Sequence, residues 1–274
     1  HGVACLVRCL AGKGVVVVSR RVDFPPKDNR FNRIKYDCPH GYIAISERIA
    51  EVLRGAGIPS DKVRVVRSSI DPERFDVGAI ERRELGVPDA APLLGNVAAL
   101  VGHKDHATLL DAMPRVLREL PDLHLVIVGD GPLRTVLTEQ IARLELAEHV
   151  HLLGYRTDVP RILRALDGFV LSSKEEGLGT SVLDAMACGV PVVATAGGGI
   201  PEMVRHGQTG LLAPVGYPEE LAACIVEMFR DRQRATSMAT RARDMVAREF
   251  NVDAMVEQNL AVYARLLQND GPIC

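Results

Sequence analysis

The sequence predicts an α/β protein in which a doubly wound parallel sheet fills the C-terminal part and a smaller α/β region precedes it. From Leu93 onward, apolar runs typical of buried strands alternate with amphipathic helical patterns. Glycine-rich segments follow several of these runs, as loops at the carboxyl edge of a parallel sheet do. The 274 residues are 47% hydrophobic, which is enough to bury a large core.

In the N-terminal part, the patterns predict short helices and strands in alternation. Helices are expected over residues 3–10 and 47–55, and strands over 15–18, 41–45 and 63–66. Between Ile70 and Ala91 the chain is rich in Pro, Gly and charged residues, which favours a linker. We therefore expect an N-terminal domain over 1–75, a linker over 76–91 and a C-terminal domain over 92–250.

The C-terminal domain shows the most regular alternation. Strands are expected over 93–98, 123–128, 150–152, 168–171 and 190–194, with helices over 106–119, 133–144, 159–166 and 180–188. After a turn at 207–210, helices are expected over 219–230, 233–250 and 253–267. This alternation is typical of a Rossmann-like sheet with helices on both faces.

Composition excludes several classes of function. A net charge of −2, 4% aromatic residues and no Trp argue against a nucleic-acid partner. The six cysteines are scattered without a Cys-x-x-Cys pair, which favours reduced thiols in a cytoplasmic protein. No apolar run approaches the ~20 residues that span a bilayer, so only peripheral contact with the inner face of a membrane stays open.

The most informative segment follows the strand expected over 168–171. There Glu176-Gly177-Leu178-Gly179 leads into a helix at Thr180, and a second acid, Asp184, stands eight residues after Glu176. Exposed backbone N–H groups and the positive end of a helix dipole form a pocket for anions such as phosphates. Carboxylates accept hydrogen bonds from sugar and ribose hydroxyls. Taken singly, Glu176 suits a helix start and Gly197-Gly198-Gly199 a turn, but their combination predicts a sugar-nucleotide site.

Several ordered motifs together carry a family resemblance. They lie at Asn96–Lys104, Val126–Gly131, Gly154–Asp158, Ser172–Thr195 and Gly197–Leu212. On these motifs the chain resembles the retaining GT-B glycosyltransferases of family four, the glycosyl transferases group 1. The resemblance implies a complete C-terminal Rossmann-like domain, a partial N-terminal Rossmann-like domain on the acceptor side, and a last helix, residues 251–274, that crosses back toward the N-terminal domain. Because the family's earlier strands have no counterpart and the chain opens at His1, an N-terminally truncated member is expected.

The resemblance also implies roles for individual residues. Glu176 and Lys104 are expected to be catalytic, with Glu176 at the transferred sugar and Lys104 at the diphosphate. Ala99 stands where the family has an arginine, and the second acid, which holds the ribose, is shortened to Asp184. The remaining donor-binding positions are Gly177, Leu178, Gly179, Thr180, Tyr155, Arg156, Gly198 and Gly199. Tyr155 and Arg156 border the nucleobase.

The expected reaction moves a hexose from a nucleoside-diphosphate sugar to an acceptor hydroxyl, with retention of configuration. The acceptor is expected to be a glycan, a lipid-linked molecule or a small molecule. No metal or cofactor is expected. His103 with His106, and His149 with His151, lack a completing acid or cysteine at a recognisable metal-site spacing. A GT-B epimerase or phosphorylase, or an inactive fragment that only binds nucleotide sugars, stays open as an alternative. A dehydrogenase is disfavoured because no Gly-x-Gly-x-x-Gly follows the first strand.

Overall fold

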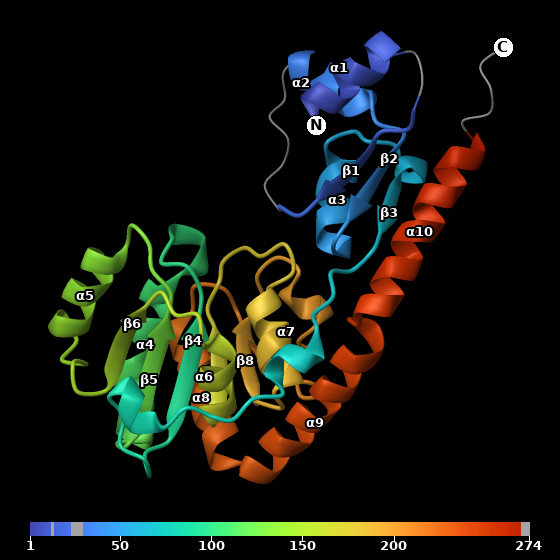
Figure 1. Ribbon diagram of the computed structural model, residues 1–274. Coiled ribbons are helices and arrows are strands. Elements are labelled where there is room, and N and C mark those ends of the chain that lie inside the picture. Colours follow the sequence, from blue (N-terminus) through green and yellow to red (C-terminus); the bar gives the residue numbers. More distant parts are fainter. Residues whose placement is uncertain (12–13, 23–29, 270–274) are drawn as a thin grey trace. The chain divides into compact units, whose positions relative to one another are not determined.

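The computed structural model describes residues 1–11, 14–22 and 30–269, without the side chains of Cys9, residues 30–33 and Asn269. The chain divides into two compact units (Figure 1). Unit 1 comprises His1–Ser69 and Phe250–Cys274, and unit 2 comprises Ile70–Glu249. Cys274 and the last residues of the helix expected over 251–274 lie outside the described residues.

Unit 2 contains a six-stranded parallel sheet with the order β6-β5-β4-β7-β8-β9. Its strands are β4 (Leu93–Val97), β5 (His124–Val128), β6 (Val150–Gly154), β7 (Gly168–Leu171), β8 (Val192–Thr195) and β9 (Leu211–Ala213). The predicted α/β fold class and parallel Rossmann-like sheet are confirmed. The strand order reverses between β4 and β7, which is where such sheets open a crevice at their carboxyl edge.

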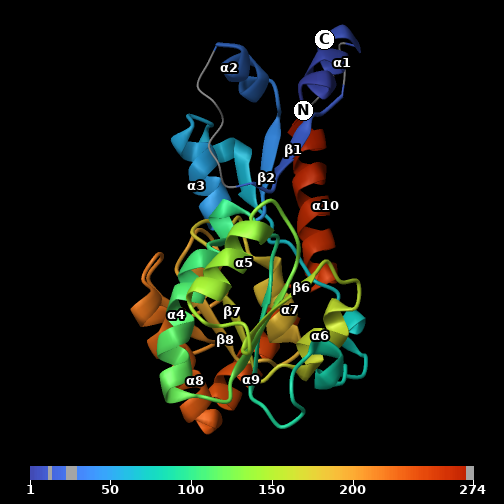
Figure 2. The same cartoon turned by 90° about the vertical axis from the view of Figure 1, so that its left-hand side faces the viewer.

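Helices cover both faces of this sheet. One face carries α4 (His106–Glu119), α5 (Arg134–Arg143) and α8 (Pro218–Arg230), while the other carries α6 (Val159–Ala165) and α7 (Thr180–Ala187), with α9 (Arg232–Glu249) against α7. Figure 2 shows α4 and α8 on one side of the strands and α6 on the other. Buried strand residues such as Leu94, Ile127 and Val170 join the α4 and α8 side chains in one core. On the opposite face, a Cβ at Gly95 would lie 2.3 Å from Leu166 Cδ1, so the glycine makes room for that leucine.

The segment 76–91, expected as a linker, packs within unit 2. It holds a 3₁₀-helix, η3 (Arg82–Leu85), and its residues Ile80, Leu85 and Val87 are buried. The Arg82 guanidinium donates to the Ala165 carbonyl at 3.0 Å and pairs with Asp167 at 3.0 Å. Apolar burial and these polar contacts hold the segment against unit 2, although its Pro, Gly and charged residues suggested a linker.

Unit 1 has a three-stranded parallel sheet, β1-β2-β3. Its elements are α1 (Gly2–Ala11), β1 (Val17–Arg20), α2 (Arg30–Asp37), β2 (Gly41–Ala44), α3 (Glu47–Gly55), β3 (Val63–Val65) and α10 (Val252–Asn269). The Ser46 hydroxyl accepts from the Ile49 N–H and so caps α3. Helix α10 packs on the strands, with Leu266 against Gly41. Figure 2 shows α3 and α10 on opposite sides of the strands.

Two short elements were not predicted. Strand β9 has only three residues, and its pairing with β8 becomes visible only in the folded sheet. Helix α2 is strongly charged and carries little apolar periodicity. None of the helices within 1–11, 14–22 and 30–269 combines the length and the apolar character needed to cross a bilayer.

Candidate functional site

The candidate site lies where the strand order of unit 2 reverses. Strands β4 and β7 are neighbours there, and the loops that follow them are hydrogen-bonded to each other. The Lys174 N–H donates to the His103 carbonyl at 2.8 Å, and the Ser172 hydroxyl donates to the Lys104 carbonyl at 3.0 Å. Residues about seventy positions apart in the sequence therefore meet at one edge of the sheet.

Lys104 and Glu176 form an ion pair at this point. The Lys104 Nζ contacts Glu176 Oε1, and the Ser173 hydroxyl donates to the same carboxylate oxygen at 2.8 Å. Only 19% of the Lys104 side chain and 9% of the Glu176 side chain are exposed. Because solvent has little access to the two side chains, their charges interact more strongly than they would on an open surface. The two residues expected to be catalytic are thus brought together.

A second ion pair, which the sequence analysis did not identify, joins the same two loops. Lys174 Nζ lies 3.0 Å from Asp105 Oδ1, and the Thr108 hydroxyl donates to Asp105 Oδ2 at 2.7 Å. The Asp105 side chain is buried, whereas that of Lys174 is 52% exposed. The left-handed φ of 49° at Asp105 is a turn conformation that neither the sequence spacing nor the composition indicates.

A buried histidine supports the loop that carries Lys104. His106 Nε2 lies 3.1 Å from Asn96 Oδ1, and Asn96 Nδ2 donates to the Val170 carbonyl at 2.8 Å, which leaves Oδ1 to accept the proton of Nε2. Burial, together with the positive charge of Lys104, lowers the pKa of His106 to about 4. His106 is therefore neutral near pH 7 and links β4, β7 and α4.

The glycine loop after β8 packs against the backbone of the Glu176 loop. The Gly199 N–H donates to the Glu176 carbonyl at 2.8 Å, and the Thr195 hydroxyl donates to the Ser173 carbonyl at 2.6 Å. A Cβ at Gly198 would lie 2.1 Å from the Glu176 carbonyl oxygen. Gly198 and Gly199, which were expected to bind the donor, thus lie against the loop that holds Glu176.

This close approach gives a testable prediction. Gly198→Ala is expected to destabilise the protein by about 2 kcal/mol or more beyond backbone strain alone, since the Glu176 loop must move. The matched control is Gly216→Ala, because Gly216 also has a positive φ but a Cβ there meets nothing within 4 Å. Urea unfolding of both variants measures the difference. Equal losses would show that the contact with the Glu176 loop is not a constraint.

The helix after the Glu176 loop begins at Gly179. This glycine has a left-handed φ of 83°, and Thr180 opens α7 as an exposed residue. Leu178 is 2% exposed, so its side chain belongs to the core and only its backbone is available to a ligand. The N–H groups at the start of α7 carry the positive end of the helix dipole.

Asp184 lies on the second turn of α7 in a largely buried position. Burial raises the pKa of Asp184 to about 6, and the nearby positive charge of Arg74 counteracts part of that rise. Arg74 belongs to a 3₁₀-helix, η2 (Pro72–Phe75), which packs against α7. The ionised Asp184 carboxylate can accept hydrogen bonds from a ligand. Burying its charge lowers the stability of the folded state.

Tyr155 and Arg156 follow β6, which is separated from β4 by β5. The Tyr155 side chain is largely exposed, whereas the Arg156 guanidinium binds the Asp158 carboxylate through two hydrogen bonds of 2.8 and 2.6 Å. This pairing lowers the pKa of Asp158 and raises that of Arg156. The loop that carries Tyr155 and Arg156 therefore follows a strand that neighbours neither β4 nor β7 in the sheet.

Comparison with known proteins identifies the family. The sequence profile described as Glycosyl transferases group 1 matches residues 79–245, a range that includes β4, β7 and the loops that follow them. The chain belongs to the glycosyl transferases group 1 family. The motifs from Asn96 to Leu212 that suggested this family all lie inside the matched range.

Two curated relatives and one solved structure are similar to this group 1 chain. It is 31% identical to N-acetyl-alpha-D-glucosaminyl L-malate synthase of Bacillus anthracis over 77% of this chain and 56% of the relative. It is 30% identical to the lipopolysaccharide core biosynthesis glycosyltransferase LpsE of Rhizobium meliloti over 92% of this chain and 71% of the relative. The crystal structure of HepE from Anabaena with UDP and glucose matches with a TM-score of 0.88 at 26% identity, over 96% of this chain and 75% of HepE. The chain thus spans little more than half of the first relative's length, and its fold is that of the GT-B glycosyltransferases.

Proposed function

We propose that the group 1 chain takes part in transferring a hexose from a nucleoside-diphosphate sugar to an acceptor hydroxyl, with retention of configuration. The observation that carries the proposal is the shielded Lys104–Glu176 ion pair between the loops that follow β4 and β7, close in the chain to the start of α7. A cation and a carboxylate held together at this edge match a donor that is negative at its diphosphate and hydroxylated at its sugar.

The diphosphate is assigned to the cationic side of the crevice. The Lys104 ammonium has three N–H donors, so it can serve phosphate oxygens as well as the Glu176 carboxylate. Backbone N–H groups of Gly177 to Thr180 and the α7 dipole add further positive potential. Since these groups neutralise a diphosphate, we propose that no divalent metal and no cofactor is needed. Lys174, half exposed on the Glu176 loop and paired with Asp105, adds a second cation beside the loop that carries Lys104.

In the proposed transfer step, charge develops on both the sugar ring and the leaving phosphate. As the bond between the anomeric carbon and the diphosphate oxygen breaks, its electron pair goes to that oxygen and positive charge grows on the sugar ring. The acceptor oxygen bonds to the anomeric carbon on the same face, and its proton passes to the departing phosphate. Lys104 and the α7 N–H groups stabilise the phosphate, and Glu176 stabilises the ring. Ser173, hydrogen-bonded to the Glu176 oxygen that also contacts Lys104, holds that carboxylate beside the lysine.

The rest of the donor is assigned to the two flanks of the crevice. Asp184 is proposed to accept hydrogen bonds from the ribose hydroxyls, while the backbone around Tyr155 and Arg156 borders the nucleobase. HepE, the structural neighbour, was solved with UDP and glucose, which supports a uridine nucleotide as the first donor to test. LpsE is a lipopolysaccharide core biosynthesis glycosyltransferase, which supports a glycan or lipid-linked acceptor. We propose that the chain meets this acceptor on the cytoplasmic side, at the membrane surface.

A panel of UDP, GDP and ADP sugars tests donor binding. A donor at a hundred times its Kd stabilises the native state by about 2.7 kcal/mol, a shift that thermal unfolding resolves readily. We expect one class of nucleotide sugar to stabilise the protein, and the Lys104→Ala variant to keep most of that stabilisation, because the Lys104 charge matters most in the transition state. If no sugar nucleotide shifts the unfolding temperature, the proposed function is wrong.

Incubation of the bound donor with and without an acceptor tests transfer. A transferase consumes the donor only when an acceptor is present, and proton NMR of the product reports the anomeric configuration. Conversion of the donor alone to an epimer would replace the transferase proposal with an epimerase.

A further inference from the structure

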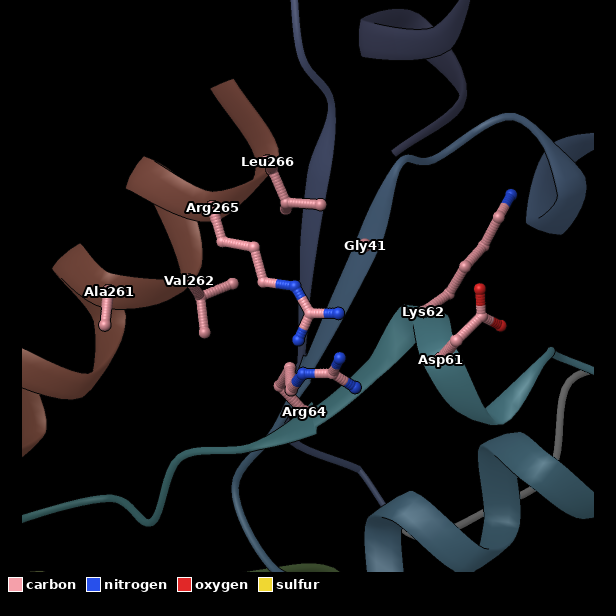
Figure 3. A pocket seen from close by; sticks show the side chains of 8 residues that line it. All are labelled: Gly41, Asp61, Lys62, Arg64, Ala261, Val262, Arg265 and Leu266. Carbon is pink, nitrogen blue, oxygen red and sulfur yellow. The ribbon is translucent and has the colours of Figure 1, made fainter. Parts of the chain in front are cut away.

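A second candidate binding site lies in unit 1. It is a cavity of about 200 Å³ between helix α10 and strands β2 and β3. Its lining combines charged residues, Asp61, Lys62, Arg64 and Arg265, with apolar ones that include Val262 and Leu266. Figure 3 shows these side chains around the cavity.

Two arginines from distant parts of the sequence face each other there. Arg64 comes from β3 and Arg265 from α10, and Figure 3 shows their guanidinium groups pointing toward one another. Arg64 Nη1 donates to the Val63 carbonyl at 3.0 Å, which fixes the direction of its side chain. Within residues 1–11, 14–22 and 30–269, neither guanidinium forms an ion pair with a carboxylate.

The other charged residues of the lining do not neutralise the positive charges of the two arginines. Lys62 Nζ donates to the carbonyls of Asp37 and Pro39, at 3.2 and 3.1 Å, and is therefore occupied. Asp61 is exposed, and in Figure 3 its carboxylate lies beside Lys62 on the side away from the arginines. Two like charges held close together repel each other, and a bound anion between them would remove that cost.

We propose that this cavity binds a phosphate group through Arg64 and Arg265. A guanidinium offers five N–H donors in a planar fork that matches phosphate oxygens, and two such forks on facing elements can hold one phosphate from both sides. The apolar stretch of Val262 and Leu266 beside the arginines accommodates the uncharged part of a phosphate ester. The phosphate belongs either to a soluble molecule or to a lipid headgroup.

This site is separate from the proposed donor site, whose residues all lie in unit 2. The inference therefore does not depend on the proposed function. Its test must read out the two arginines individually, because a phosphate that binds near Lys104 would also stabilise the protein.

Arginine footprinting provides that readout. The whole chain is treated with phenylglyoxal, and mass spectrometry of its peptides gives the modification rates of Arg64 and Arg265. The probes are inorganic phosphate, phosphatidylcholine vesicles that contain phosphatidate, and vesicles of phosphatidylcholine alone, all at one ionic strength set with sodium chloride. We expect phosphate or phosphatidate vesicles to slow modification of both arginines together.

A variant tests whether the two arginines act as one site. Arg265→Gln is expected to raise the phosphate concentration that half-protects Arg64 by about tenfold or more, since a charge-assisted contact is lost. The control is Arg118→Gln, which removes one exposed charge from α4 in unit 2 and should leave protection of Arg64 unchanged.

Protection by phosphate indicates a soluble ligand, and protection only by phosphatidate vesicles indicates a lipid headgroup. Absence of protection by either probe, or unchanged protection of Arg64 in Arg265→Gln, overturns the proposal.

Discussion

Lys104→Ala is expected to lower the turnover of the donor by about 10²–10³-fold, because a positioned cation that stabilises developing negative charge contributes on that scale. Lys104 is largely shielded from solvent and lies against Glu176, so water cannot readily substitute for its charge. The fall should appear in kcat more than in the affinity for the donor, since the charge on the leaving phosphate grows in the transition state. Steady-state kinetics with the donor found in the panel gives both quantities.

Lys174→Ala is the matched control for this prediction. Lys174 also pairs with an acid between the same two loops, but its side chain is half exposed. We expect its loss to cost far less activity than the loss of Lys104. If Lys104→Ala keeps turnover within about threefold of the parent, or no more than matches Lys174→Ala, the assigned role of Lys104 is wrong.

Structural damage can be separated from lost catalysis with a double variant. Removing Lys104 alone leaves the Glu176 charge shielded and uncompensated, which destabilises a protein. Lys104→Met combined with Glu176→Gln removes both charges, so the free energy of unfolding should recover toward that of the parent while turnover stays low. Recovery of turnover together with stability would mean that the pair is structural.

Asp184→Asn is expected to raise stability and weaken donor binding at the same time. Burial raises the pKa of Asp184 to about 6, so the folded state retains this proton at pH values where the unfolded state, with an ordinary pKa of 3.8, has lost it. The folded state is therefore favoured at low pH and loses up to about 3 kcal/mol as the pH rises from about 4 through 6. An asparagine has no such cost, so the variant should be more stable at pH 7 and show little difference near pH 4.

The effect of Asp184→Asn on the donor has the opposite sign. A hydrogen bond from a ribose hydroxyl to a carboxylate is stronger than one to an amide, so donor affinity should fall by about tenfold or more. Asp244→Asn on α9, an exposed carboxylate, is the control and should change neither property. Chemical unfolding at pH 4 and 7, with donor titrations at pH 7, measures both. Higher stability with unchanged donor affinity would remove Asp184 from the site.

The parts of the fold that sequence predicts well are those with long and clear periodicity. The bounds of α3, α4 and β7 agree with the expectation residue for residue, because amphipathic stripes and a buried apolar run define them. Strand β9 and helix α2 were missed because three apolar residues, or eight mostly polar ones, carry no period of their own. The segment 76–91 was expected as a linker, and local composition does not reveal that a few buried residues such as Leu85 attach it to unit 2.

The candidate site could be predicted only in part. Motif spacing identified Lys104 and Glu176, and the order of β4 and β7 explains why they meet. The Lys174–Asp105 pair and the neutral His106 could not be found in this way, since both depend on contacts between residues far apart in the sequence and on a left-handed turn at Asp105. In each case tertiary burial, and not the local residue pattern, determines the chemistry.

Hydrogen–deuterium exchange with the sugar nucleotide that best stabilises the protein tests the donor site most directly. Backbone amides slow in exchange where a ligand binds them or closes the loop around them. The account predicts slower exchange over residues 98–105 and 172–180, with β9 and α9 unchanged. If the nucleotide binds and these two loops exchange at the same rate as before, while another region slows, then the donor does not lie between Lys104 and Glu176.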